Sequence, residues 1–379
     1  MAAKTVFIIA GEASGDLLGA TLMQEIKTVA TDPVQFTGVG GAQMEKQGLV
    51  SLFPMTELSV MGFFEVFKHL PRLLKRLDQT TKAVLAQNPD VLVTIDSPDF
   101  GLRIARKIKK LRPEIKLVHY VAPTVWAWRP GRAKKIAAFL DGLLCLFPFE
   151  PPYFEKHNLK ARFVGHPLTR DIPEITDQQK QAFCRDHGLN MDQPILAMLP
   201  GSRIREIQSL TPALLETMTR LKQNIPNLQI IIPTLPHVIG YLDAFKDMAH
   251  IFIPKDNVEK YTAFTVSRTA LHASGTVALE LALCRTPMVT IYKLNALSAA
   301  IAKRVLKTPY ANLVNILLRH PVVPELLQEK ANPDNMTQIT QALLVNDQLH
   351  EAQATQLDQI KQHLQENEPQ SAANFVLTI

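Results

Sequence analysis

Two carboxylates follow a short apolar segment in the first half of the chain. Residues 91–95 are apolar except for one threonine, and they lead into Asp96, Ser97, Pro98 and Asp99. If this segment is a strand of a parallel sheet, both carboxylates lie at its carboxyl end, where catalytic groups gather. Either could then act as a general base. The alternative is an ordinary turn at Pro98 in which Asp99 caps a helix.

A glycine-containing loop follows the first apolar segment, residues 6–10, and a helix is expected directly after it. The candidate ligand-binding residues of this loop are Gly11, Glu12, Ser14, Gly15 and Asp16. Amides at a helix N-terminus can hold an oxyanion or sugar hydroxyls, although Ser14 or Asp16 could instead only cap the helix. The loop lacks the Lys-Ser/Thr ending of a P-loop, and residues 38–41 lack the spacing of a dinucleotide fingerprint.

Two loops in the second half of the chain could hold phosphate, because each follows an apolar segment, 195–199 or 269–273. Their candidate nucleotide-binding residues are Ser202, Arg203, Ser274, Gly275, Thr276 and Glu280. The guanidinium of Arg203 can bind a phosphate through two parallel hydrogen bonds, and Glu280 could accept hydrogen bonds from ribose hydroxyls. Together the two loops indicate a nucleotide, whereas each alone has a capping explanation.

Both tryptophans of the chain lie within residues 119–129, and a basic stretch follows them. Aromatic rings beside cations can grip sugars and phosphates, which makes Trp126 and Arg129 candidate substrate contacts. The same residues could stack nucleic-acid bases. The plainest alternative is a core tryptophan next to a solvated basic helix.

Residues 58–77 combine apolar side chains at mostly helical spacing with a dense set of bases. The candidate membrane or acyl-chain contacts are Met61, Phe63, Phe64, Phe67, Leu70, Arg72, Leu73 and Leu74. An apolar face rimmed with cations suits an anionic bilayer. A core-facing amphipathic helix, broken near Pro71, is the alternative, and the paired phenylalanines and the bases after them favour the membrane.

The elements that must position these residues are those of a parallel α/β protein. The 379 residues, 46% of them hydrophobic, suggest two domains. Short apolar segments alternate with helical patterns in both halves, which predicts two doubly wound sheets facing one cleft. We place the domains at 1–170 and 171–345, with a helical segment at 346–379 that could pack back onto the first domain.

Composition limits the remaining possibilities. The three cysteines are far apart and lack metal-ligand spacing, so neither a disulfide framework nor a metal site is expected, and a reducing cytoplasm fits. Because no apolar run reaches about eighteen residues, membrane contact should be peripheral. The formal net charge of +6 favours an anionic partner, such as nucleic acid, phospholipid or a phosphorylated substrate.

Seven segments in order resemble the bacterial lipid A disaccharide synthase family over nearly the whole chain. They are GEASGD (11–16), VMG with its apolar neighbourhood (60–67), IDSPDF (95–100), HYVAPTVWAWR (119–129), FVGHP (163–167), LPGSR (199–203) and ASGTVALE (273–280). This resemblance implies the GT-B fold, with two Rossmann-like domains. It also implies a cytoplasmic enzyme that is peripheral on the inner face of the inner membrane of Gram-negative bacteria.

The resemblance further implies a reaction and roles for particular residues. The expected donor is UDP-2,3-diacylglucosamine and the acceptor 2,3-diacylglucosamine 1-phosphate, giving a β-1′,6-linked disaccharide and UDP with inversion. Asp96 matches the family's aspartate and becomes the expected base, with Asp99 as competitor. Asn315 is carried over as a site residue, although this chain has Val314 where the family usually has proline.

The implied partners are the two lipid substrates and anionic lipids of the inner membrane, without a cofactor; a homodimer is left open. A UDP-sugar 2-epimerase of the same fold is the alternative enzyme. A basic nucleic-acid-binding protein is a third interpretation, which rests on charge and the tryptophan segment and requires salt-sensitive binding. The resemblance argues against it, so we expect no nucleic acid.

Overall fold

The computed structural model describes residues 4–58, 63–128, 130–273, 275–293, 308–366, 368 and 370–379, with the side chains of residues 63–69 excepted. The chain divides into two compact units. Unit 1 comprises Met1–His166 and Leu364–Ile379, and unit 2 comprises Pro167–His363. The first limit therefore lies four residues before the expected one. The predicted third segment, 346–379, is divided between the units: residues up to His363 belong to unit 2, and those from Leu364 belong to unit 1.

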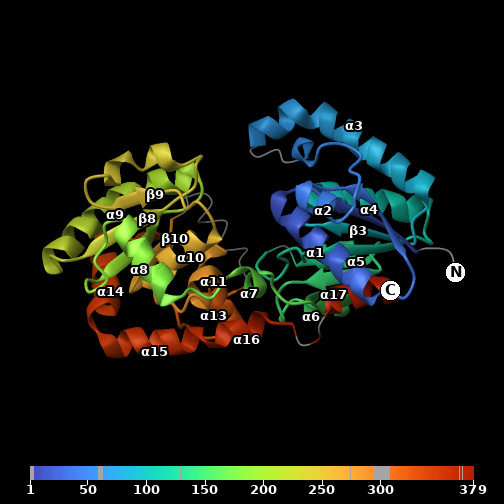
Figure 1. The fold of residues 1–379 in the computed structure, drawn as a ribbon. Coiled ribbons are helices and arrows are strands. Elements are labelled where there is room, and N and C mark those ends of the chain that lie inside the picture. The colour runs from blue at the N-terminus through green and yellow to red at the C-terminus, as the bar shows by residue number, and fades with distance from the viewer. Residues whose placement is uncertain are drawn as a thin grey trace. The chain divides into compact units, whose positions relative to one another are not determined.

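Unit 1 contains a six-stranded parallel sheet in the order β2-β1-β3-β4-β5-β6 (Figure 1). Its strands are β1 (Lys4–Ala10), β2 (Val34–Val39), β3 (Val91–Ile95), β4 (Lys116–Tyr120), β5 (Gly142–Cys145) and β6 (Lys160–Phe163). Strands buried on both faces are apolar nearly throughout, which is why these segments could be predicted. Because β2 and β3 flank β1 on opposite sides, the strand order reverses between β1 and β3. Ligands of such sheets bind at this switch point.

Helices cover both faces of the unit 1 sheet. They are α1 (Ala13–Val29), α2 (Ala42–Lys46), α3 (Phe63–Gln87), α4 (Pro98–Leu111), α5 (Gly131–Ala137), α6 (Pro152–Glu155) and α17 (Ser371–Thr378), with the 3-10 helix η1 (Met55–Glu57). Successive residues of β1 point to opposite faces. Phe7 and Ile9 pack with residues of α4 and α5, whereas Val6 and Ile8 pack with residues of α1 and α17. The last helix of the chain is thus part of the unit 1 core.

Helix α3 continues through Pro71, so the break that belonged to the core-facing alternative does not occur. A proline inside a helix removes one backbone hydrogen bond and normally destabilises it. Here the residues after Pro71 are anchored to unit 1. Arg76 donates two hydrogen bonds to Glu57, at 2.9 and 2.6 Å, and Val84 is fully buried.

Unit 2 contains a second six-stranded parallel sheet, in the order β12-β11-β10-β7-β8-β9. Its strands are β7 (Ile195–Leu199), β8 (Gln229–Pro233), β9 (His250–Phe252), β10 (Thr269–Ala273), β11 (Met288–Tyr292) and β12 (Glu325–Leu327). The short edge strand β12 was not predicted. The order reverses between β7 and β10, so the two predicted phosphate loops follow the two strands at this switch point.

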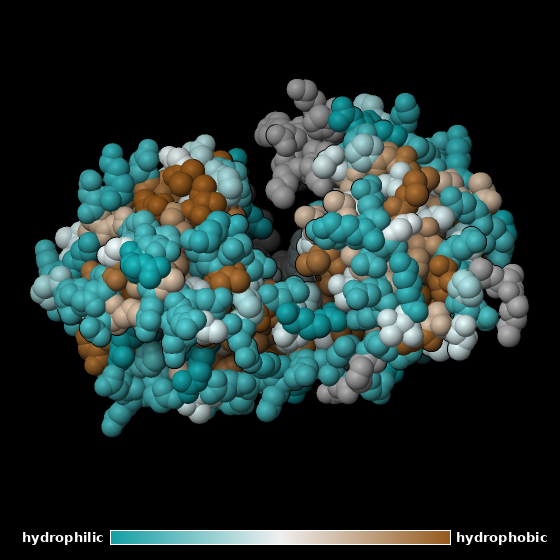
Figure 2. All heavy atoms as spheres, viewed as in Figure 1, coloured by the Kyte–Doolittle hydropathy of each residue, from teal (hydrophilic) through white to brown (hydrophobic). Residues whose placement is uncertain are grey.

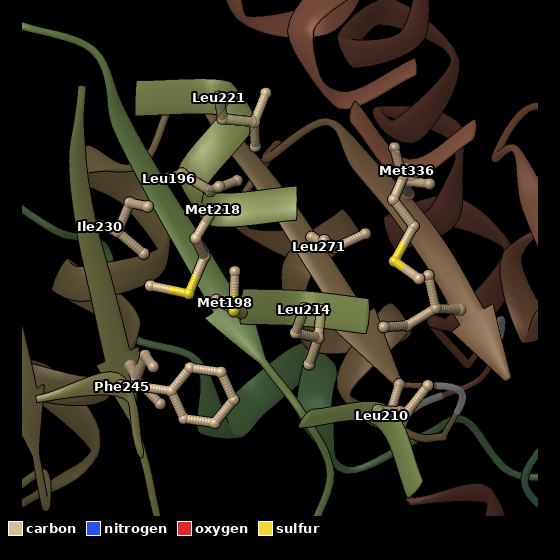
Figure 3. Close-up of a cluster of buried hydrophobic side chains, with 14 of the residues drawn as sticks. Leu196, Met198, Leu210, Leu214, Met218, Leu221, Ile230, Phe245, Leu271 and Met336 are labelled. Atoms are coloured by element: carbon tan, nitrogen blue, oxygen red, sulfur yellow. The ribbon is translucent and has the colours of Figure 1, made fainter. Parts of the chain in front are cut away.

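The helices of unit 2 include one long helix, α9, that supplies much of its core. They are α7 (Leu168–Asp171), α8 (Asp177–Asp186), α9 (Ile204–Asn224), α10 (Asn257–Val266), α11 (Val277–Leu283), α13 (Leu313–Leu318), α14 (Pro333–Val345), α15 (Asp347–Leu357) and α16 (Gln359–Leu364), with the 3-10 helices η2 (Ile239–Tyr241), η3 (Asp243–Phe245) and η4 (Gln328–Lys330). Leu210, Leu214, Met218 and Leu221 recur at three- and four-residue spacing and face the sheet (Figure 3).

Within the predicted helical segment 346–379, the polar stretch 347–366 contains two helices, α15 and α16. Its apolar face is well buried, since Leu357, Ile360 and Leu364 are at most 1% exposed. The amphipathic spacing was therefore informative, whereas the division into two helices was not visible in it. Among the described residues, no helix is long and apolar enough to cross a bilayer.

Candidate active site

The carboxyl end of β3 holds Asp96 in a strained and well-supported position. Asp96 has φ +50° and Ser97 has φ +38°, both in the left-handed region that costs non-glycine residues about 1–2 kcal/mol each. The backbone N–H of Asp96 donates to the carbonyl of Tyr120 at 2.9 Å, and that of Ser97 donates to Asp96 Oδ1 at 2.9 Å. Such strain persists where the surroundings fix it, and it concentrates at functional sites.

The loop after β1 meets Asp96 across the switch point. Ser14 Oγ donates to Asp96 Oδ2 at 3.4 Å. Glu12 lies close enough for its pKa to be raised, mainly by partial burial and then by the negative charge of Asp96, while a hydrogen bond with Ser97 partly offsets this. A Cβ on Gly11 would lie 2.5 Å from Ser97 Oγ, so glycine allows the two loops to approach. The structure thus brings together residues predicted from separate motifs.

Two further predicted residues of unit 1, Gly15 and Asp99, lie in the first turns of α1 and α4. A Cβ on Gly15 already lies 3.4 Å from the carbonyl of Ile95, so a small residue lets α1 start close to β3. Asp99 is exposed in the first turn of α4, where its charge suits the helix dipole. Of the two aspartates, Asp96 is the one held by contacts from neighbouring strands.

Asp16, a predicted ligand contact, has a carboxylate that is buried and occupied by backbone donors. Asp16 is 4% exposed and accepts hydrogen bonds from the N–H groups of Gly41, Gln43 and Met44, at 2.8 to 3.0 Å. It therefore fixes the start of α2 rather than capping its own helix or meeting a substrate.

Trp126, a predicted substrate contact, is also buried. It is 8% exposed, its indole N–H donates to Glu150 Oε1 at 3.2 Å, and its ring meets Phe149 edge-on. Trp128, which is 41% exposed, is the tryptophan at the surface. The other predicted contact of this segment, Arg129, lies outside the described residues.

The loop after β7 presents a cation at the start of α9. Arg203 precedes the helix, and its side chain is 77% exposed, with Nη1 2.8 Å from Glu206 Oε1. The carbonyl of Ser202 accepts a hydrogen bond from His237 Nε2 at 3.0 Å. Gly201 has φ +124°, and a Cβ there would lie 3.6 Å from that of Ala273. The loops after β7 and β10 are therefore neighbours.

In the loop after β10, Gly275 and Thr276 are exposed, whereas Ser274 lies outside the described residues. Gly275 has φ +159°, at the limit of the region that favours glycine. Glu280, expected to accept from ribose, is engaged by Lys260 Nζ at 2.7 Å. Burial, and then the charge of Glu280, raises the pKa of the Tyr261 hydroxyl. Any ribose would share Glu280 with these neighbours.

Asn315, which the resemblance gave as a site residue, is fully buried inside unit 2. Its Nδ2 donates to the carbonyl of Val323 and to Glu325 Oε1, both at 2.8 Å, and its Oδ1 accepts from the N–H of Val323 at 2.8 Å. Both amide hydrogens are consequently used within the protein. The sequence analysis missed Glu325, although an acid directly after Val323-Pro324 in an apolar segment is a usable signal.

A buried polar chain extends from this point to β10. Asn312 Nδ2 donates to Thr290 Oγ1 at 2.6 Å, and Thr290 Oγ1 lies 2.8 Å from His272 Nε2. Burial lowers the pKa of His272 to about 4, so the imidazole is neutral near pH 7. Because Ala273 follows His272 and ends β10, this chain supports the base of the phosphate loop.

The predicted membrane contacts fall partly outside the described residues. Met61 is not described, and Phe63, Phe64 and Phe67 lie on the described backbone of α3 without described side chains. Leu70 and Leu74 are 42% and 54% exposed. Arg72 is exposed beside them, and Leu73 is half-buried. Figure 2 shows hydrophobic side chains in separate patches on a mostly hydrophilic surface.

The part of the chain that the structure describes contains no group of three or more histidine, cysteine, aspartate or glutamate residues arranged to hold a metal ion.

Comparison with protein families gives a match along almost the entire chain. The family model described as lipid-A-disaccharide synthetase matches residues 6–379. The lipid-A-disaccharide synthase of Rhodospirillum centenum is 46% identical over 356 residues, which are 93% of this chain and 86% of that protein. The corresponding protein of Nitrobacter hamburgensis is 39% identical and covers 99% of this chain and 95% of its own length.

Solved structures of lower identity share the fold. The UDP-GlcNAc 2-epimerase of Neisseria meningitidis, bound to UDP-GlcNAc, aligns with a TM-score of 0.63 at 11% identity over 98% of both chains. The S. aureus MnaA structure with UDP gives 0.64 at 11% identity, over 99% of this chain and 95% of that one. At this identity the likeness shows the fold alone, and the predicted α/β GT-B class is confirmed.

Proposed function

Given that this chain belongs to the lipid-A-disaccharide synthase family and is a glycosyltransferase of lipid A biosynthesis, we propose that it transfers 2,3-diacylglucosamine from UDP to 2,3-diacylglucosamine 1-phosphate. The observation that carries this proposal is the family match from residue 6 to residue 379, with relatives up to 46% identical among those compared. The epimerase alternative has support from the fold only.

In the proposed reaction Asp96 is the general base. Its carboxylate takes the proton of the acceptor 6-hydroxyl while that oxygen bonds to the anomeric carbon of the donor. The bond from that carbon to the UDP oxygen breaks, and its electron pair leaves with UDP. One displacement converts the α-linked donor to a β-linked product. The fixed backbone of Asp96 and the hydroxyl of Ser14 support this assignment, because both restrict where the carboxylate points.

The residues proposed to hold UDP lie on unit 2. The exposed guanidinium of Arg203 would pair with the pyrophosphate, and the neighbouring Gly275 amide and Thr276 hydroxyl would donate to the same oxygens. Such donors stabilise the negative charge that develops on a leaving group. Because we assign this role to protein groups, transfer should persist when EDTA removes divalent cations.

We assign membrane contact to α3, and with it a peripheral position on the inner face of the inner membrane. Substrate acyl chains favour the bilayer by about 0.8 kcal/mol per buried methylene, so an enzyme that meets them there avoids their extraction. Exposed Leu70 and Leu74 beside the cationic Arg72 suit an anionic lipid surface.

The direct test is an assay in detergent with both lipid substrates, following the disaccharide 1-phosphate and UDP with and without EDTA. The proposal predicts equal amounts of the two products, dependence on the acceptor, and little effect of EDTA. A folded protein that makes no disaccharide but converts UDP-GlcNAc without an acceptor would instead be an epimerase. Loss of transfer in EDTA that magnesium restores would overturn the metal-independent role of Arg203.

A further inference from the structure

Glu150 is a buried carboxylate of unit 1 that the proposed reaction leaves without a role. It is 2% exposed and lies in the loop between β5 and α6. Trp126 Nε1 donates to its Oε1 at 3.2 Å, the N–H of Phe147 donates to its Oε2 at 3.0 Å, and the N–H of Leu146 also contributes. Because every one of these groups is a donor, the site suits a side chain with two acceptor oxygens and no hydrogen.

These hydrogen bonds join two loops at the carboxyl end of the sheet. Trp126 belongs to the loop after β4, which we call the tryptophan loop (residues 121–128), and Glu150 belongs to the loop after β5. Aromatic packing reinforces the junction. The rings of Trp126 and Phe149 are 5.2 Å apart and perpendicular, and those of Phe149 and Phe147 are 5.5 Å apart and stacked.

The tryptophan loop begins next to the proposed base. The carbonyl of Tyr120, its preceding residue, accepts the hydrogen bond from Asp96 N–H. Val121 has φ +79°, a conformation that a β-branched residue rarely adopts, and its N–H donates to the carbonyl of Leu144 at 3.1 Å. From this strained start the loop reaches the surface at Trp128. Its placement therefore depends on what anchors it from below.

We propose that Glu150 is a positioning residue whose ionised carboxylate holds the tryptophan loop in place for binding of the acylated sugar acceptor. Protonation would put a hydroxyl hydrogen where an N–H now points, so one of the hydrogen bonds would be lost and the loop would loosen. The choice of the acylated sugar acceptor as the ligand rests on the proposed function. The hydrogen bonds around Glu150 are observed in the structure and do not depend on that function.

The surroundings make this protonation relevant near neutral pH. Burial raises the pKa of Glu150 to about 7, although its three hydrogen bonds oppose the shift. Among the described residues, the titratable groups near this cluster include Cys145 of β5, Glu155 of α6 and His166 after β6. Arg132 of α5 lines a small pocket with residues of the tryptophan loop. Burial and the charges of both glutamates raise the pKa of the Cys145 thiol, and burial lowers that of His166 to about 4. The thiol and the imidazole are therefore neutral near pH 7.

Tryptophan fluorescence tests the proposal without any substrate. The chain has two tryptophans, so Trp128→Phe leaves Trp126 as the reporter. In this background we expect its emission to change with pH with a midpoint near 7. The change should disappear in Glu150→Gln and remain in Glu155→Gln, a matched substitution at an exposed position on α6. A flat profile in the parent, or an unchanged titration in Glu150→Gln, would overturn the proposal.

Steady-state kinetics then test positioning in the otherwise native chain. The KM for the acceptor should rise about tenfold as pH falls through 7 while kcat changes less, which is the pattern of lost binding rather than lost chemistry. Glu150→Gln should show the high KM at every pH, and Glu150→Asp should restore part of the pH dependence. Equal KM values for the native chain and Glu150→Gln at pH 8 would contradict the proposal.

If Glu150→Gln does not fold, Trp126→Phe gives an independent test. It removes the hydrogen bond by which Glu150 reaches the tryptophan loop, so the KM for the acceptor should be high at every pH. A KM profile like that of the native chain would count against the Trp126–Glu150 link. Should the chain show no transfer at all, the fluorescence titration would still decide whether Glu150 holds the loop.

Discussion

The switch points of units 1 and 2 use different backbone chemistry. In unit 1 the left-handed positions after β3 are Asp96 and Ser97, which carry side chains and so are strained. In unit 2 the corresponding positions after β7 and β10 are Gly201 and Gly275, which adopt positive φ at little cost. In unit 1 the strained backbone fixes the direction of the Asp96 carboxylate. In unit 2 the glycines leave backbone amides and the Arg203 side chain accessible.

The buried polar residues that support the loops of the two units also differ in how they respond to pH. Unit 1 supports its tryptophan loop with Glu150, whose pKa of about 7 makes it sensitive to pH. Unit 2 supports its phosphate loop with the amides of Asn312 and Asn315 and with neutral His272, whose pKa is lowered to about 4. In the proposed reaction, proton transfer therefore depends on unit 1, while His272 beneath the proposed anion-binding loop of unit 2 stays neutral near pH 7.

The largest effect should come from removing the proposed base. Asp96→Asn keeps the size of the side chain but cannot take a proton, and we expect kcat to fall by roughly 10³-fold. Asp99→Asn, in the first turn of α4, is the matched control and should stay within about threefold of the native rate. Normal turnover by Asp96→Asn would break the assignment of proton chemistry to unit 1.

A smaller effect should show whether Asn315 in unit 2 stabilises the fold or contacts the ligand. Asn315→Ala leaves the N–H and carbonyl of Val323 without their partners, which should lower the free energy of unfolding by about 2–3 kcal/mol. Urea unfolding measures this, with Asn374→Ala at an exposed position of α17 as the control. Unchanged stability together with weakened UDP binding would mean that Asn315 acts on the ligand directly.

The smallest effect concerns the lipid-facing surface that we assign to unit 1. Replacing Leu70 and Leu74 with serine removes exposed apolar area, and partitioning onto anionic liposomes should fall about tenfold. Leu111→Ser, at a 52% exposed leucine on α4, controls for general loss of surface hydrophobicity. If the α3 variant and the control sediment equally with liposomes, the proposal that α3 contacts the membrane is wrong.

Most of the fold could be predicted because buried parallel strands are short apolar segments with helices between them. The edge strand β12 has three residues and includes a glutamate, so it carries no such pattern. The core-facing alternative for α3 included a break near Pro71, because local rules disfavour proline inside a helix. The helix continues there, and beyond Pro71 the side chain of Arg76 is hydrogen-bonded to Glu57, a tertiary contact that local rules do not include.

Site residues that directly follow a strand could be predicted from the sequence. Residues whose hydrogen-bond partners lie far away in the sequence were harder to place. Asp96, Ser14 and Arg203 could be found from position alone. Asp16 and Trp126 could not be placed correctly, because their partners lie some 24 to 28 residues further along the chain and are brought to them by the sheet. Glu150 lacked any motif, although a single acid between Phe149 and two prolines is an unusual setting that could have drawn attention.

The division of labour between the two switch points can be measured through UDP binding. Calorimetry with the native protein, Asp96→Asn and Arg203→Ala separates the donor site from the base, and Arg205→Ala, an exposed arginine on α9, controls for charge. We predict that Asp96→Asn binds UDP within about twofold of the native protein, whereas Arg203→Ala binds it at least about tenfold more weakly. Native-like binding by Arg203→Ala, or equal weakening in both variants, would contradict the account.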